Sequence, residues 1–235
     1  MRVPERKRSS TAVGAVLLGI ATALLAPCAR SAPFERLEIG ASVPDGEIDF
    51  GLSKVVLPAP GSEWRVIAAK GSASIAPSGD RIYTIKLRNV VLVRIREGRW
   101  AGLIELGGLG ESLTWAPWMT SACRVAARTI YSEGVDADRF KPTCLMVTSS
   151  FPTKNMGTSP GVFQDALDWL KEHGIAAPEF VHLGRFARYA EGNYNHMNAY
   201  LSADVHPADS VPRMMGFLAW MKDAAQASAA GVVEP

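Results

Sequence analysis

The sequence predicts an α+β protein in which antiparallel β-hairpins pack with two amphipathic helices, preceded by an N-terminal signal segment. Apolar and polar residues alternate on both sides of short glycine-containing turns, which is typical of hairpins. Two later stretches carry apolar residues at helical spacing. Strands and helices do not alternate regularly along the chain, and this favours an α+β fold over a parallel α/β sheet.

The first residues have the pattern of a bacterial-type export signal. Residues 2–8 carry four basic side chains and precede an uncharged, mostly apolar stretch over 9–29. Ala29 and Ser31 occupy the two small-residue positions of a cleavage site. We therefore expect a signal peptide over 1–31 that is cleaved after Ser31.

Two other interpretations of this segment remain open. About 20 apolar residues cross a bilayer, so the stretch over 9–29 is long enough to stay as an uncleaved anchor. A lipid anchor at Cys28 is disfavoured, because Pro27 stands directly before that cysteine. In each case the basic end stays inside. We therefore expect a periplasmic or secreted protein, or an inner-membrane anchored one with its body outside the cytoplasm.

Composition limits the partners of the mature chain. Removal of residues 1–31 takes away five basic side chains and one acidic one, and the formal charge changes from +2 to −2. This balance argues against nucleic acid as a partner. No phosphate-binding loop or close pair of metal-ligating histidines occurs. We expect no metal and no cofactor, and membrane contact only if residues 9–29 are retained as an anchor.

Two cysteines remain after cleavage, Cys123 and Cys144. In an oxidising compartment such a pair favours one disulfide, which would contribute about 3 kcal/mol in the chain-entropy picture. The alternative is two unpaired buried thiols, since free cysteine packs as a small hydrophobe.

The remaining 204 residues suit one domain. Proline and glycine are frequent over 32–62, which predicts an extended lead-in with one short strand near Lys54–Leu57. A single α+β domain is expected over 63–224. An alanine-rich end over 225–235 predicts a loose tail.

The first half of the domain predicts strands. Trp64–Ala68 is an apolar strand, and small residues over 71–80 predict a loop after it. Alternation over Arg81–Leu106, interrupted at Glu97-Gly98, predicts a hairpin. Further along, a polar loop is expected over Ser132–Lys141 and a strand over Cys144–Thr148.

Two helices are expected in the second half. The first covers Ser159–His173, with Ser159 as the N-terminal cap, Pro160 in the first turn and Gly174 at the C-terminal stop. The second begins near Ser210 or Val211, and its apolar stripe includes Met214, Phe217, Leu218 and Met221.

A second hairpin provides the candidate ligand site. Its strands cover Phe180–Tyr189 and Tyr194–Leu201 and turn at Glu191-Gly192. If Ala190 lies opposite Asn193, one face collects aromatic rings with polar tips and several hydrogen-bonding groups, which suit a polar ligand or a sugar. The candidate ligand-binding residues are Arg185, Tyr189, Tyr194, His196, Asn198 and Tyr200. The alternative is a sheet face that is packed under a helix.

The catalytic signals are weak. Residues 157–161 spell G-x-S-x-G, the pattern of a hydrolase nucleophile elbow, but no strand leads directly into it and Pro160 follows the serine. We therefore expect no catalytic residue and favour a non-enzymatic binding or accessory protein, with an envelope protein or a small polar ligand as partner. The alternatives are a small exported serine hydrolase using Ser159 or the region of His196, and a membrane-tethered interaction domain.

Overall fold

The computed structural model describes residues 31–43, 46–57, 64–78, 81–110, 128–134, 143–156, 161–190, 193–203, 215–223 and 225. The predictions that concern the export signal, Cys28, Cys123, Ser159, Pro160 and Met214 lie outside these residues. Among the described residues, no helix has both the length and the apolar character needed to cross a membrane.

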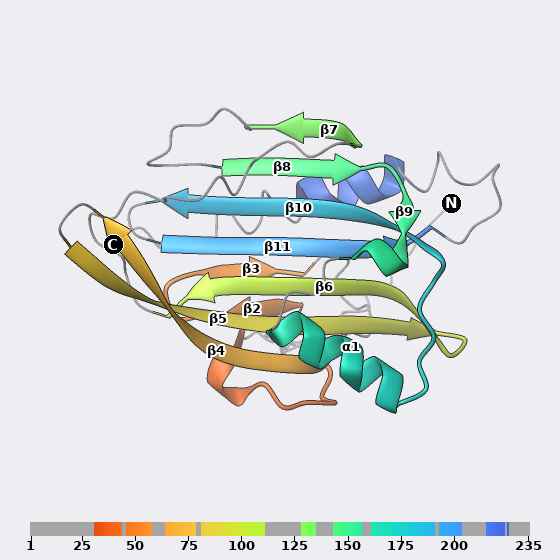
Figure 1. Cartoon of the computed structure of the whole chain (residues 1–235), viewed down its shortest axis with the longest axis horizontal. Coiled ribbons are helices and arrows are strands. Elements are labelled where there is room, and N and C mark those ends of the chain that lie inside the picture. The colour runs from red at the N-terminus through yellow and green to blue at the C-terminus, as the bar shows by residue number, and fades with distance from the viewer. Residues whose placement is uncertain are drawn as a thin grey trace, which may run out of the picture.

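One large antiparallel sheet forms the body of the protein (Figure 1). Strands that are joined by a hairpin are neighbours in the sheet. The two predicted hairpins lie side by side, because β6 of the first pairs with β11 of the second. The sheet broadly confirms the predicted α+β class. In sheet order its strands are β4 (Arg65–Ser78), β5 (Arg81–Arg96), β6 (Arg99–Leu109), β11 (Asn193–Ser202), β10 (Phe180–Ala190), β8 (Thr143–Thr148) and β7 (Thr129–Glu133), and β9 (Phe151–Pro152) pairs with one end of β10.

The turn between β5 and β6 has the backbone that a two-residue hairpin needs. Glu97 has a φ of 52° and Gly98 a φ of 73°, and the flanking Arg96 and Arg99 are paired. Two successive positive φ angles match the right-handed twist of the strands. The predicted turn at this position is confirmed.

The loop predicted over 71–80 is wrong for residues 71–78, because β4 continues as a strand to Ser78; residues 79 and 80 lie outside the described part of the chain. The small residues of β4 pair with β5 throughout, and Pro77 lies opposite Ile82. Strand β4 is the last strand on this side of the sheet. A proline is tolerated there because an edge strand does not need every backbone N–H for pairing.

A second correction concerns β7. Ser132 and Glu133, which were expected in a polar loop, belong to this strand and pair with Met146 and Leu145. The strand lies at the opposite edge of the sheet and its side chains are half-buried or exposed. A strand of this kind lacks the apolar alternation by which buried strands are recognised.

The sheet is covered on both faces. Helix α1 (Val162–Glu172) lies on one face, in front of the sheet in Figure 1, and buries Phe163, Ala166 and Leu170 against strands β4 to β6. A helical segment over 215–223 lies on the other face and buries Phe217 and Met221. Both helices therefore use the apolar stripes that the sequence predicts. Ala225, the first residue of the predicted tail, is helical and 8% exposed.

The N-terminal segment is more ordered than the predicted extended lead-in. It forms a three-stranded sheet of β1 (Ala32–Pro33), β2 (Glu47–Asp49) and β3 (Lys54–Val56), with a short 3-10 helix at Phe34–Arg36. Only the third strand was expected. Ile48 and Phe50 join the same core cluster as the helical segment 215–223. Arg88 of β5 fixes this contact, because its guanidinium donates to the Phe50 carbonyl oxygen at 2.6 Å and pairs with Glu35.

Helix α1 begins later than predicted and ends where predicted. Its N-cap is Gly161, with a φ of 146°, and no side chain caps the first turn. At the other end Gly174 has a φ of 66°, and Ile175 N–H donates to the Leu170 carbonyl at 2.9 Å. This is the glycine stop that the sequence predicts, and Ile175 packs back onto the apolar cluster of the helix.

Candidate functional site

The register of the β10–β11 hairpin is the one that the sequence predicts. Ala190 pairs with Asn193, and Arg185 pairs with Asn198. Since side chains alternate between the two faces of a strand, the polar residues Arg185, His196, Asn198 and Tyr200 share one face. We call it the α1 face, because helix α1 packs on the same side of the sheet.

A row of three hydrogen-bonded side chains crosses the α1 face. Arg185 Nε donates to Asn198 Oδ1 at 3.0 Å, and Asn198 Nδ2 donates to Glu105 Oε2 at 2.9 Å. The three residues lie on β10, β11 and β6 and are directly opposite one another in register. Asn198 thus holds a cation and an anion apart in fixed positions.

The row lies in a cavity of about 380 Å³. Part of the wall comes from the segment after β8, which pairs with one end of β10 through β9 and contributes Asn155 and Met156 to the lining. Two hydrogen bonds from Thr153, to the carbonyls of Pro178 and Glu179, hold this segment in place. The cavity is lined by Glu105, Phe151, Asn155, Met156, Phe163, Leu183, Arg185, Asn198 and Tyr200.

Tyr200 forms the junction between the cavity and helix α1. Its ring lies 5.4 Å from that of Phe163, and the residue is half-buried. Burial raises the pKa of Tyr200 to about 12; Glu105 acts in the same direction and Arg185 opposes it. The phenol therefore stays protonated at neutral pH and serves as a hydrogen-bonding group rather than as a base.

Three of the predicted ligand residues, Tyr189, Tyr194 and His196, lie outside the cavity lining. Tyr189 is 4% exposed and Tyr194 8% exposed, and they form a small apolar cluster with Leu109 and Cys144. Burial raises the pKa of Tyr194 above its usual range. These two tyrosines pack against residues of neighbouring strands at this end of the hairpin.

His196 lies between the cavity and this cluster. Its ring covers Gly107 of β6 so closely that a Cβ atom there would lie 2.1 Å from His196 Cε1. Burial lowers the pKa of His196, so the ring is neutral. Its Nδ1 is buried and has no hydrogen-bond partner within the described part of the chain. His182 lies on the opposite face, as the register requires.

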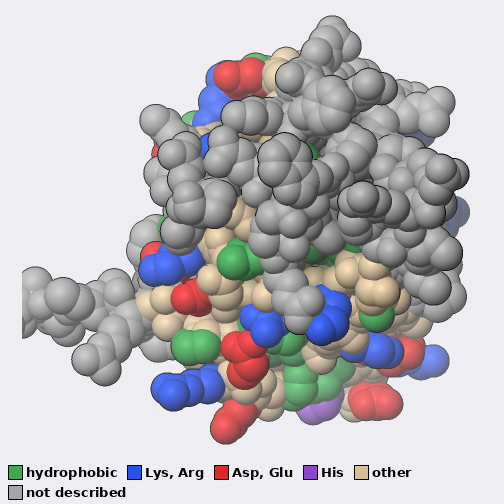
Figure 2. Space-filling view, turned by 90° about the vertical axis from the view of Figure 1, so that its left-hand side faces the viewer, with side chains coloured by type: hydrophobic (Ala, Val, Ile, Leu, Met, Phe, Trp, Pro, Cys, Tyr) green, Lys and Arg blue, Asp and Glu red, His purple; other side chains and the backbone are tan. Residues whose placement is uncertain are grey.

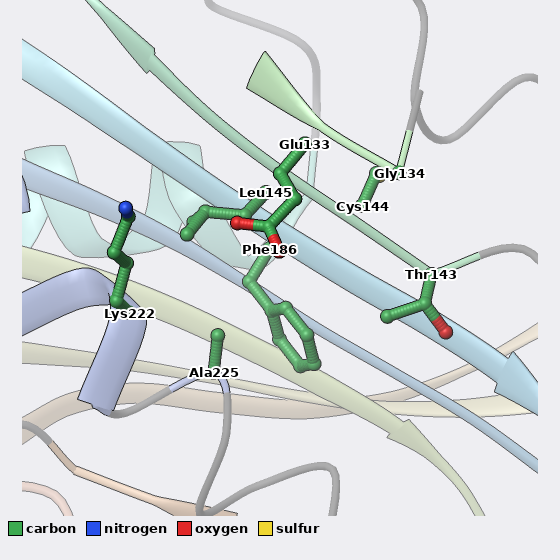
Figure 3. Close-up of a pocket in the computed structure, with 8 residues that line it drawn as sticks. All are labelled: Glu133, Gly134, Thr143, Cys144, Leu145, Phe186, Lys222 and Ala225. Atoms are coloured by element: carbon green, nitrogen blue, oxygen red, sulfur yellow. The ribbon is translucent and has the colours of Figure 1, made fainter. Parts of the chain in front are cut away.

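A second cavity, of about 540 Å³, lies on the other face of the sheet, between β8 and the helical segment 215–223. Figure 3 shows Leu145 and Phe186 on the sheet side, with Lys222 on the helix and Glu133 on β7 at the rim. Lys222 lies 4.3 Å from the centre of the Tyr131 ring, and its hydrogen bond to Tyr131 raises the Lys222 pKa. The charged groups of this cavity lie at its rim, whereas the polar row crosses the cavity on the α1 face, so we favour the cavity on the α1 face as the ligand site.

The structure adds Glu105 to the residues that the sequence singled out. Glu105 belongs to the first predicted hairpin, and the pairing of two distant hairpins brings it opposite Asn198. Within the described residues no group of three or more metal-ligating side chains occurs. Figure 2 shows basic and acidic side chains interspersed on the described part of one side of the molecule.

Cys144 is buried, with 1% of its surface exposed. Its predicted partner Cys123 lies outside the described residues, so the disulfide stays a prediction.

Comparison of the chain with protein-family models, with curated proteins and with solved structures found no match. The function therefore has to be inferred from the chemistry of the site.

Proposed function

We propose that this protein is a non-enzymatic binding or accessory protein of the cell envelope that takes a small polar ligand in the cavity on the α1 face. The observation that carries this proposal is the hydrogen-bonded row of Arg185, Asn198 and Glu105 inside that cavity. Ligand sites typically combine apolar walls with a few fixed polar groups. The cavity volume of about 380 Å³ is within the usual range for small molecules.

The chemistry of the cavity favours binding over catalysis. Nucleophilic catalysis needs a nucleophile within hydrogen-bonding reach of a base, and the cavity lining offers a phenol that stays protonated and a carboxylate that accepts from an amide. Three strands of one sheet hold the polar row, so its geometry is fixed before a ligand arrives. Such preorganisation reduces the entropic cost of binding.

A thermal-shift screen of small polar solutes tests the binding proposal. We expect at least one solute class to raise the melting temperature of the wild type, and Arg185→Met to lose the shift. Lys154→Met is the matched control, because it removes a cation from an exposed position next to the cavity wall. A library without any stabilising solute, or equal shifts in wild type and Arg185→Met, would contradict the proposal.

The envelope location rests on the basic, apolar and small-residue pattern of residues 1–31. Intact mass under non-reducing conditions, on protein expressed with its native N-terminus, tests it. A soluble species that begins at Ala32 and is two hydrogens lighter than the reduced chain supports cleavage and the Cys123–Cys144 bridge. A full-length mass confined to membranes would instead favour the tethered domain.

A further inference from the structure

Resting on the proposed function, we infer that the ligand is a small zwitterion, with an anionic group bound by Arg185, a cationic group bound by Glu105, and a hydrocarbon body between them. The inference starts from the two charges of opposite sign in one cavity. It also uses the amide that separates these charges.

The separation of the charges follows from the sheet. Arg185 and Glu105 lie on β10 and β6, with β11 between them. Neighbouring strands are 4.7–4.9 Å apart, so the two Cα atoms are about 10 Å apart. Asn198 fills the gap by bonding to both residues. In the described part of the chain the two charges are therefore linked through this amide and not by a direct ion pair.

Each charge selects against a ligand with only one charge. A simple carboxylate that approaches Arg185 also feels the repulsion of Glu105, and a simple amine that approaches Glu105 feels that of Arg185. Both charges act on the hydroxyl of Tyr200, with opposite signs, so their fields overlap inside the cavity. A ligand that carries both charges, in the complementary order, gains attraction at each end.

The walls suit a hydrocarbon body between the charged ends. Phe163 and Met156 are buried, Leu183 and Phe151 are half-buried, and all four line the cavity. Apolar ligand atoms placed against them are removed from water, which favours binding in proportion to the apolar area that is buried. The spacing of the charges favours a ligand in which several carbon atoms separate the carboxylate from the ammonium group.

Calorimetric titration of the full mature chain with a series of amino acids tests the inference. The series is glycine, β-alanine, γ-aminobutyrate and ε-aminocaproate, and the comparison solutes are butyrate, butylamine and the uncharged polyols glycerol and glucose. We expect one of the two longer amino acids to bind most tightly. Butyrate and butylamine should bind at least tenfold more weakly than γ-aminobutyrate.

Variants at Arg185 and Glu105 show which end of the ligand each residue binds. Arg185→Met should bind the amino acid and the amine equally, because the anion site is gone. Glu105→Gln should bind the amino acid and the carboxylate equally, because the cation site is gone. Arg185→Lys keeps the charge and should retain the preference for the zwitterion. Circular dichroism verifies that each variant is folded, and Glu105→Gln keeps the inference testable if Arg185→Met does not fold.

The outcomes separate this inference from the proposed function. Equal or tighter binding of butyrate, butylamine or a polyol at the same residues would overturn the zwitterion and leave a binding protein. Binding that both Arg185→Met and Glu105→Gln leave unchanged would also overturn it. If neither this series nor the thermal-shift library contains a ligand, both proposals fail.

Discussion

The two faces of the β10–β11 hairpin come from alternating residues of the same strands, yet they have opposite characters. On one face Gly184, Phe186 and Met197 are closed off by the helical segment 215–223. On the α1 face Arg185 and Asn198 lie in an open cavity. The closed face gains its stability from apolar burial, whereas the open face contains charges that remain within reach of water.

The difference shows how one hairpin supplies both a rigid support and a binding site. Phe186 is 2% exposed and Met197 fully buried, so the backbone between them is held by packing on the far side of the sheet. The side chains of the polar row on the α1 face inherit this rigidity without contributing much to it. Substitutions on the two faces should therefore affect different properties.

The largest expected effect is on the closed face. Phe186→Ala removes a fully buried ring and should lower the free energy of unfolding by about 3–5 kcal/mol. Phe180→Ala is the matched control on the same strand, because Phe180 is 39% exposed. Urea denaturation measures both. A loss below about 1 kcal/mol for Phe186→Ala would show that the closed face is not a packed core.

A smaller effect is expected where Met221 of the helical segment packs over Gly184 of the sheet. A Cβ atom on Gly184 would lie 2.7 Å from Met221 Cγ, so Gly184→Ala should cost about 1–3 kcal/mol by overpacking. Met221→Ala in the same chain should remove the clash. A double-mutant cycle then gives a favourable coupling of about 0.5–3 kcal/mol. Additive costs would mean that this helix does not pack over Gly184.

The open face should tolerate the loss of its central amide. Asn198→Ala removes two hydrogen bonds to charged partners that water can reach, and we expect a loss of about 1–2 kcal/mol in the free energy of unfolding. Ligand-induced stabilisation should disappear at the same time. A loss comparable to that of Phe186→Ala would show that the row is mainly structural, which removes the contrast between the faces.

The smallest effect concerns the pH dependence of stability. Burial lowers the pKa of His196 below its ordinary 6.5, so the unfolded chain binds this proton at a higher pH than the folded one. Stability should fall as the pH drops below about 6.5, by at most about 1.4 kcal/mol per pH unit. Urea denaturation between pH 5 and 7 should give a shallower slope for His196→Gln. If His196→Gln keeps the wild-type slope of unfolding free energy against pH, a buried neutral His196 ring is contradicted. The control is His173→Gln, which removes an exposed imidazole.

The sequence predicts the hairpins well because period-two alternation and the turn together define the register. The pairing of Ala190 with Asn193 places Arg185 opposite Asn198, and both were expected on one face. Glu105 could not be found in this way. It reaches the site only through the pairing of β6 with β11, which local patterns do not encode.

The sequence also could not show which residues of the predicted face are buried. Tyr189 and Tyr194 have the same alternation as Tyr200, but they meet Leu109 of another hairpin, while Tyr200 meets the cavity. The cavity wall depends on Thr153 and two distant carbonyls. The small residues of β4 were predicted to form a loop for a different reason. They lie in an edge strand whose extent is set by its pairing with the long strand β5, and not by its own apolar pattern.

The strict alternation along β10 also limits how this gene can change in length. A single codon inserted or deleted between Phe180 and Arg185 would turn every later side chain of the strand over. Phe186 would then face the cavity and Arg185 the core. Changes of two codons keep the side chains on their faces, and changes between the paired residues Ala190 and Asn193 leave both strands as they are. Related genes should therefore differ in length between these two residues, or by pairs of codons, within this hairpin.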